Sequence, residues 1–139
     1  MELYLDVAKH ELRDPDSGSV AEDLRQIAER VARLQTRTVA GAAFIGLIAE
    51  AHAKPGNRDS FLDFVNRRRE ITRRVLKRAQ ERSEIRDDTD IDLVIDALGG
   101  AMTFRLLQGH APLNAEFARA LVELVLKGCS TKEPQGGAP

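Results

Sequence analysis

The segment Ile85–Gly128, IRDDTDIDLVIDALGGAMTFRLLQGHAPLNAEFARALVELVLKG, contains two consecutive helical patterns, and each of them is apolar on two faces. In the first pattern, from Asp90 to Gln108, steps of three and four residues define two apolar stripes. One stripe holds Ile91, Val94, Ile95, Leu98, Met102 and Leu106, and the other holds Leu93, Ala97, Gly100, Phe104 and Leu107. A small monomeric domain needs only one of these stripes for its own core, so the second stripe predicts a partner.

The second pattern, from Asn114 to Lys127, is apolar around most of the helix. Its charged residues, Glu116, Arg119, Glu123 and Lys127, form a single narrow stripe. A helix that is apolar nearly all round must be buried nearly all round. We therefore expect both helices to pack against the same two helices of a second copy, as an intermolecular four-helix bundle in a homodimer. The expected dimer contacts are Ala97, Gly100, Phe104, Leu107, Ala118, Val122 and Val125.

The length and residue usage of the chain favour a single helical domain. A chain of 139 residues can bury one sizeable core. Its valines and isoleucines recur at helical rather than alternating spacing, and it contains no Asn-Gly or Asp-Gly hairpin signal. We therefore predict an all-α fold, an antiparallel bundle of about six helices.

Charge and cysteine usage exclude several classes of protein. The net charge is −1, so the chain as a whole has no electrostatic attraction for nucleic acid. The single cysteine, Cys129, cannot form an intramolecular disulfide and fits a reducing compartment. No run of about 18 apolar residues is present, and the first residues lack the basic start of a signal peptide. We expect a soluble, cytoplasmic protein without a membrane partner.

Helix-terminating residues divide the rest of the chain into segments. Glu2–Leu12 is a short amphipathic piece, and Ser19 then begins a capping box with Glu22. A similar pair, Thr89 with Asp92, is expected to open the helix of the first pattern described above. The other expected helices are one that buries Val20, Leu24, Ile27, Val31 and Leu34, one from Ala40 to Ala53, and one from about Arg58 to Arg82. Residues 129–139 are polar and rich in glycine and proline, which predicts a disordered tail.

A series of short sequence pieces follows a characteristic order along the chain. They are Asp14–Ser19 (DPDSGS) before a helix, Glu84–Asp90 (EIRDDTD), Leu98–Gly100 (LGG) before Phe104–Leu107 (FRLL), and Ala111–Leu113 (APL) before Phe117–Ala118 and Leu121–Val122. In this order and spacing they resemble the ligand-binding and dimerisation domain of TetR/AcrR-type transcriptional regulators. The resemblance spans roughly Asp14 to Gly128, and it implies that the last two helices dimerise and that the earlier helices enclose an effector pocket.

The resemblance also implies how the chain is organised. Residues 1–13 would be the end of a connecting helix, 14–128 the effector-binding and dimerisation domain, and 129–139 the tail. Family members begin with a three-helix DNA-binding module that contains a helix-turn-helix, and the residues before Ser19 are too few to hold it. DNA is therefore expected as a partner only through a missing N-terminal module. The implied function is the effector-binding and dimerisation half of a one-component, ligand-responsive repressor whose effector is a small molecule.

The effector is expected among the helices that begin near Val20, Ala40, Arg58 and Asp90. Candidate ligand-binding residues are bulky or polar and lie on faces turned toward the core: Phe44, Ile48, Phe64, Arg68 and Met102. Helical phase does not separate pocket lining from plain core, so simple packing is the alternative for the four apolar residues. Arg68 falls on an apolar side, where a cation needs either an internal acid or an anionic ligand.

The Arg58 helix carries a strong basic excess, with ten Lys or Arg against five Asp or Glu between Arg58 and Arg86. Phosphate contacts would favour a protein that binds RNA or DNA, but such proteins add a helix-turn-helix or interleaved aromatic residues. A solvated helix face is the preferred interpretation. A self-contained helical adaptor or scaffold that dimerises and binds a protein partner is the remaining alternative.

No pattern in the sequence supports an enzyme. The three histidines lie in separate segments, and their spacing matches no metal site. Asp88, Asp90 and Asp92 alternate like the start of a calcium loop, but Leu93 stands where its glycine belongs. The chain also lacks a nucleophile elbow and a phosphate-binding glycine loop. We predict no catalytic residues, no metal site and no cofactor.

Overall fold

The computed structural model describes residues 14–131, which form five α-helices and one short 3-10 helix. The elements are α2 (Val20–Arg37), α3 (Ala40–Ala53), η1 (Pro55–Asn57), α4 (Arg58–Glu81), α5 (Ile91–Gln108) and α6 (Ala115–Cys129). The predicted all-helical bundle is confirmed, and the bounds of α3 and α5 agree closely with the sequence pattern. The amphipathic piece predicted at Glu2–Leu12 lies outside the described residues.

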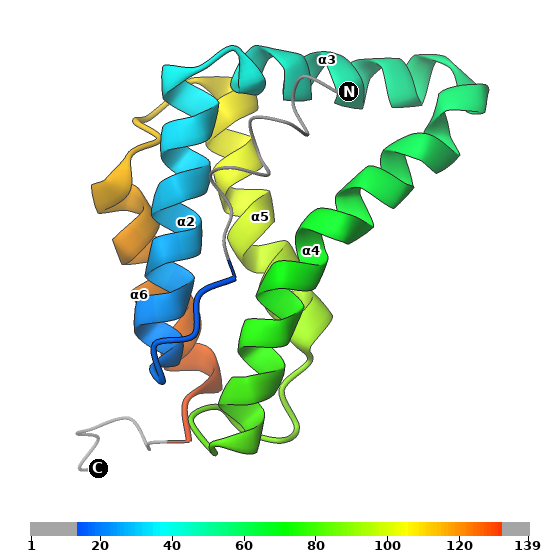
Figure 1. The fold of residues 1–139 in the computed structure, drawn as a ribbon. Helices are drawn as coiled ribbons and strands as arrows, with labels where there is room; N and C mark the ends of the chain where they lie inside the picture. Colours follow the sequence, from blue (N-terminus) through cyan, green and yellow to red (C-terminus); the bar gives the residue numbers. More distant parts are fainter. Residues whose placement is uncertain (1–13, 132–139) are drawn as a thin grey trace, which may run out of the picture.

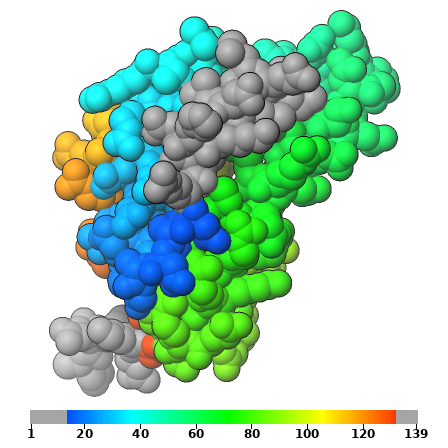
Figure 2. Space-filling view, viewed as in Figure 1, coloured from blue at the N-terminus to red at the C-terminus, as the bar shows by residue number. Residues whose placement is uncertain are grey.

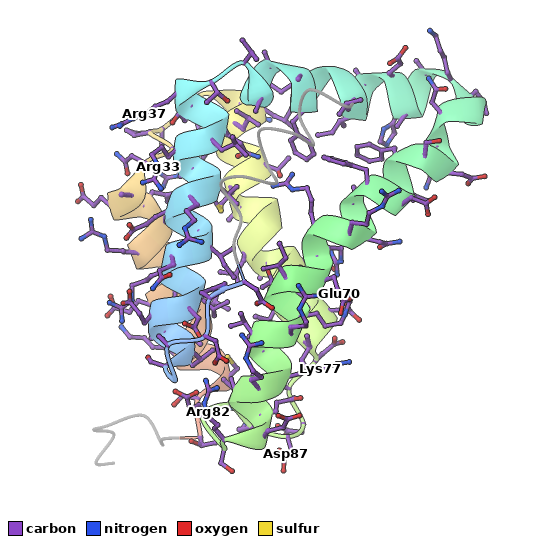
Figure 3. All side chains as sticks on the ribbon, viewed as in Figure 1. Arg33, Arg37, Glu70, Lys77, Arg82 and Asp87 are labelled. Carbon is purple, nitrogen blue, oxygen red and sulfur yellow. The ribbon has the colours of Figure 1, made fainter. Side chains whose placement is uncertain are left out.

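The helices form a body with an overhanging corner (Figure 1). α2 packs along α6 and also contacts α3, α4 and α5. α3 crosses the upper end of the body, and α4 descends obliquely from the far end of α3 toward the lower end of α2. Figure 3 shows Arg33 and Arg37 on the side of α2 that faces away from α4, and Lys77 on the outer side of α4. The sides of α2 and α4 that face each other are therefore available for mainly apolar contacts.

Side-chain caps begin three of the helices. The Ser19 hydroxyl accepts a hydrogen bond from the Glu22 N–H (3.4 Å), which is one half of the predicted capping box, whereas the Ser19 N–H donates to the Ser17 hydroxyl (3.2 Å) instead of to Glu22. Asn114 accepts a hydrogen bond from the Phe117 N–H (2.9 Å). The cap predicted at Thr89 is wrong by one position. Asp90 is the residue with extended backbone before α5, and its carboxylate accepts the Leu93 N–H at 3.1 Å. An aspartate next to a threonine offers a second possible cap, and spacing alone does not choose between them.

The DPDSGS loop and the first residue of α2 are held by hydrogen bonds to one buried and one half-buried acid. Ser17 N–H donates to the carboxylate of Asp23 (2.9 Å), a residue that is fully buried. Val20 N–H donates to Glu84 (3.2 Å), which lies beyond the end of α4. Gly18 turns the chain with a φ of 87°, a left-handed conformation that favours glycine. The motif noticed in the sequence is thus the connection that anchors the start of α2 against the end of α4.

The end of α6 corrects the predicted boundary of the tail at 129. Cys129 is the last residue of α6 and is buried, and its carbonyl accepts the Arg86 N–H at 3.0 Å. Arg86 also donates from its guanidinium to the Gly128 carbonyl at 3.1 Å. These contacts supply partners for the unsatisfied carbonyls at a helix end. Burial raises the pKa of the Cys129 thiol.

Two groups of buried side chains hold the helices together. The larger, the main core, comes from α2, α4, α5, α6 and their connections, and includes Leu24, Val75, Leu76, Ile95 and Val122. The smaller, the corner cluster, consists of Leu34, Ala40, Phe44 and Phe64, with Leu47, Ile48, Phe61, Val65 and Leu106 packed against it. Both α2 and α4 contribute deeply buried side chains to the two groups: Leu24 of α2 and Leu76 of α4 lie in the main core, and Leu34 of α2 and Phe64 of α4 lie in the corner cluster.

The two stripes of α5 separate as the sequence predicts. Val94, Ile95, Leu98 and Met102 are buried, whereas Leu93, Ala97, Gly100, Phe104 and Leu107 are exposed. Together with Leu124 of α6, these five exposed residues make up what we term the apolar face. Phe104 is 56% exposed and Leu124 is 69% exposed, although both are large apolar side chains.

The placement of α6 changes part of the expected dimer surface. Ala118 and Val122 are fully buried in the main core, and Val125 is half-buried against it. Ala118 and Val122 are therefore not available to a partner chain, which corrects their assignment as dimer contacts. The reason is that α6 packs its Ala118–Val122 side along α2 and turns Leu124 outward. A helix that is apolar nearly all round gives no internal sign of which side faces inward.

Candidate ligand-binding cavity

A cavity of about 430 Å³ lies among α2, α3, α4 and α5. Its volume is within the range of small-molecule sites. The lining is mainly apolar and consists of Leu24, Ile27, Ala28, Val31, Gln35, Phe44, Val65, Arg68, Arg69, Ile71, Thr72, Ile95, Asp96, Leu98, Gly99, Gly100, Met102 and Thr103. These residues come from the four helices among which the sequence placed a pocket. The cavity lies between the main core and the corner cluster and draws residues from both.

Three of the five predicted ligand residues line this cavity, and two do not. Phe44, Arg68 and Met102 are on its wall. Phe64 is 1% exposed and lies behind Phe44, with the two ring centroids 6.4 Å apart. Ile48 packs against the corner cluster away from the wall. Both residues are on the predicted inner faces of their helices, but they pack in the corner cluster instead of on the cavity wall.

Arg68 lies with its guanidinium near two phenyl rings. Its guanidinium carbon is 5.3 Å from the centroid of the Phe44 ring and 5.7 Å from that of Phe64. At these distances the negative ring faces attract a cation. The corner cluster therefore positions a positive charge at the edge of an apolar cavity.

Gln35 lines the cavity, although it was not among the residues predicted from the sequence. It lies four residues after Val31 on α2 and extends the row Leu24, Ala28, Val31 along the cavity wall. Only 5% of the residue is exposed, and its buried Oε1 atom has no hydrogen-bond partner among residues 14–131. The available signal was a polar residue that continues an apolar helical row, but the predicted row ended at Leu34.

An ion-pair network joins α4 to α5 beside the cavity. Arg69 pairs with Asp96, and it also contacts Asp92 at 3.2 Å, while Arg73 reaches Asp92 at 2.6 Å. Hydrogen bonds from Arg73 and then Arg69 hold the pKa of the Asp92 carboxyl below its ordinary value. The hydrogen bond to Asp96 is the main cause of the raised pKa of Arg69. Arg69 and Asp96 thus line the cavity as a paired cation and anion.

Most of the remaining basic side chains on the second half of α4 also have acidic partners. Arg74 pairs with Asp14 (3.0 Å), and Arg78 contacts Asp14 and Asp16, each at 3.5 Å. Arg78 also donates to the Pro15 carbonyl (2.6 Å). The basic helix is therefore used to hold the DPDSGS loop and α5, which argues against a free phosphate-binding surface on this part of α4.

Residues 14–131 contain no group of three or more His, Cys, Asp or Glu side chains that lie close enough to hold a metal ion. No helix in this range is long and apolar enough to cross a membrane.

Comparisons with known proteins identify the family to which this chain belongs. Residues 14–125 match the family described as tetracyclin repressor-like, C-terminal domain. The chain is 28% identical over 129 residues to YdeS of Bacillus subtilis (strain 168), described as an uncharacterized HTH-type transcriptional regulator. That alignment covers 92% of this chain and 65% of YdeS. The crystal structure of the TetR family transcription regulator SCO0332 superposes with a TM-score of 0.85 at 30% identity, covering 90% of this chain and 69% of that protein. The chain therefore belongs to the tetracyclin repressor-like family of transcription regulators, and its residues 14–125 form the C-terminal domain of that family.

Proposed function

We propose that this domain binds a small-molecule effector and forms the dimer of a ligand-responsive transcriptional repressor. The observation that carries the proposal is the cavity of about 430 Å³, which residues of four helices line, among them Phe44, Arg68 and Met102. A self-contained scaffold does not require a cavity of this size, so we regard the scaffold as the weaker proposal.

α4 is the element through which an effector would act. Its first half carries Phe64 in the corner cluster and its second half carries Leu76 in the main core. A molecule that binds beside Phe44 and Arg68 would favour one position of the corner cluster over another. Because α4 is a continuous helix, it would transmit that shift to the main core. The coupling can be no larger than the difference in the ligand's affinity for the two positions.

The DNA contact would come from a helix-turn-helix module that precedes this domain. YdeS is described as an HTH-type regulator, and this chain aligns with 65% of it. We propose that the paired arginines of α4 make no specific DNA contact. In a gel-shift assay at about physiological salt, this chain alone should then retain no DNA against competitor.

Cavity binding can be tested with a small fluorescent apolar probe, 2-methoxynaphthalene. Ala28 is buried on the cavity wall, so Ala28→Phe should fill the space and abolish binding in a fluorescence titration. Ala49 on α3 is exposed and outside the cavity, so Ala49→Phe is the matched control and should bind as the wild type does. Failure of the wild-type chain to bind the probe, or equal binding by Ala28→Phe, would contradict the proposal.

The dimer would form through the apolar face of α5 and α6. Isolated exposed apolar residues are common on monomers, but Leu93, Phe104, Leu107 and Leu124 lie on the two helices that the sequence predicted to be two-sided. Gly100 belongs to the apolar face and also lines the cavity. Ligand binding and dimerisation would therefore share one segment of α5.

Sedimentation velocity tests this proposal. The wild-type chain should be a dimer at tens of micromolar, and Phe104→Lys should be monomeric because an unpaired charge would be buried in the interface. Leu62→Lys is the matched control, since Leu62 is 41% exposed on α4, away from the apolar face. A monomeric wild type, or dissociation by both substitutions alike, would rule out this interface.

A further inference from the structure

We infer that a second copy of this chain completes the effector cavity by closing its open side along α5. This inference rests on the proposed function and deepens it, because the cavity of one chain is then incomplete without the apolar face of the other copy. It predicts that effector binding and dimerisation strengthen each other.

The open side of the cavity lies on α5. Of the described residues that line the cavity, only Asp96, Gly99 and Gly100 are exposed, and the others are buried or half-buried. A Cβ added at Gly99 or Gly100 would meet no atom of residues 14–131 within 4 Å outside its own stretch of helix. The described residues therefore leave the space beside these two glycines open.

An ion pair bounds this opening at its lower end. Arg69 of α4 pairs with Asp96 of α5. Above Asp96 the two helices diverge toward the upper end of the body (Figure 1), and Gly99 and Gly100 follow on α5. Because the Asp96 carboxylate already has a cationic partner, a surface that covers this rim would not bury an unpaired charge.

The rim of the opening and the apolar face share the same turns of α5. Asp96 and Gly99 belong to the rim, Ala97 and Phe104 belong to the apolar face, and Gly100 belongs to both. One helical turn advances by only about 5.4 Å. A protein surface that covers the apolar face at Ala97 and Phe104 therefore also borders the cavity.

The spacing of the apolar face indicates that its occupant is a second copy. On α5 its residues follow steps of four, three, four and three, the spacing of a seam between two packed helices: Leu93, Ala97, Gly100, Phe104 and Leu107. The seam is centred on Gly100 and carries no charge. An antiparallel, two-fold pairing about this centre puts Phe104 of one copy against Ala97 of the other. It also puts Leu107 against Leu93, so apolar side chains meet throughout.

The second copy would remove water from the open side of a bound apolar molecule. Burial of apolar surface stabilises the covered state in proportion to the area removed from water. The bound molecule in turn adds apolar surface beside Gly100, where the two copies meet. By thermodynamic linkage, binding and dimerisation then strengthen each other by the same factor, and we expect a coupling of about tenfold.

Titration of the fluorescent probe 2-methoxynaphthalene at different protein concentrations tests the coupling without any substitution. Sedimentation velocity first gives the concentration at which the wild-type dimer dissociates. The dissociation constant of the probe should be about tenfold higher below that concentration than above it. Saturating probe should in turn make the dimer persist to lower protein concentration.

Leu124→Lys allows the same comparison at a single protein concentration. Leu124 is 69% exposed on α6 and does not line the cavity, so the substitution should separate the two copies and leave the cavity walls intact. The dissociation constant of the probe should rise about tenfold in this variant. Val39→Lys is the matched control, because Val39 is 66% exposed and lies outside both the cavity and the apolar face. It should dimerise and bind the probe as the wild type does, and circular dichroism checks that both variants are folded.

The outcomes separate this inference from the proposed function. If the wild type dimerises and binds the probe, and monomeric Leu124→Lys binds it equally well, the cavity is a ligand site that is complete in one chain and the inference is wrong. Tighter binding by the monomer would also overturn the inference, because the second copy would then obstruct the opening. A wild type that forms no dimer, or binds no probe, would contradict the proposed function and this inference together.

Discussion

The main core and the corner cluster differ in how many elements hold each side chain in place. In the main core, residues from α2, α4, α5 and α6 bury one another, and Val75, Leu76 and Ala79 are fully buried. The corner cluster has four buried residues, and several small apolar residues of α3 remain exposed beside it. The corner projects from the body at the upper right of Figure 2. The cavity therefore has one wall on the tightly packed main core, which resists movement, and one wall on the less tightly packed corner cluster, which can shift.

The largest expected effect is the loss of a main-core side chain. Leu76→Ala should lower the free energy of unfolding by about 3 kcal/mol, because Leu76 is fully buried and the surrounding helices cannot collapse into the space. Leu47→Ala in the corner should cost about 1 kcal/mol, since Leu47 is only half-buried. Urea unfolding measures both variants. Equal losses would show that the corner is as firmly packed as the body.

Two glycines of α3 should respond in opposite directions. Gly41→Ala should destabilise by about 2 kcal/mol, because its new Cβ would collide with the Gln35 carbonyl and push α3 away from α2. Gly46 is exposed with no neighbouring atom within contact distance, so Gly46→Ala should stabilise by about 1 kcal/mol through helix propensity. Thermal unfolding of the two variants decides this point. Stabilisation by both would mean that α3 does not approach α2 closely.

Substitutions of two alanines of α2 should distinguish the open cavity from the filled main core. Ala32 is 1% exposed in the main core, and Ala32→Phe should cost about 2 kcal/mol by overpacking. Ala28 lines the cavity, so Ala28→Phe should cost less than about 1 kcal/mol. Chemical denaturation gives both values. A cost for Ala28→Phe that matches the cost for Ala32→Phe would contradict an open cavity between the two cores.

The smallest expected effect concerns the ion pairs that join α4 to α5. The Asp92 carboxyl has a pKa below its ordinary value of 3.8, so its contribution is fully present above that pH and is lost as the pH falls through the lowered pKa. Asp92→Asn should therefore be slightly less stable than the wild type at pH 7, and the difference should vanish in acid. Because the Asp92 side chain is 61% exposed, salt should also reduce the difference.

The matched control for Asp92 is Asp87→Asn. Asp87 is exposed in the loop before α5 (Figure 3), and no ion pair joins it to another described residue. Its stability relative to the wild type should not vary with pH in the same way. Urea unfolding at several pH values compares the two variants, and identical profiles would remove the proposed role of Asp92.

Local sequence patterns determined the helices and their stripes. The bounds of α3, the cap at Ser19 and the two stripes of α5 follow from hydrophobic period and capping chemistry, which act over a few neighbouring residues. The same patterns carried the family resemblance, and they placed a pocket among the correct four helices. Phe44, Arg68 and Met102 were predicted because each lies on an inner face.

The tertiary structure decided which face of each helix meets which neighbour. Ala118 and Val122 belong to the core because α6 turns that side toward α2, and Phe64 lies behind the cavity wall because α4 crosses obliquely. Gln35 lies on the cavity wall where α3 closes over its backbone at Gly41. Helical phase specifies which residues share a side of one helix. The crossing angles and contacts between helices depend on all the side chains at once, and these set the walls of the cavity.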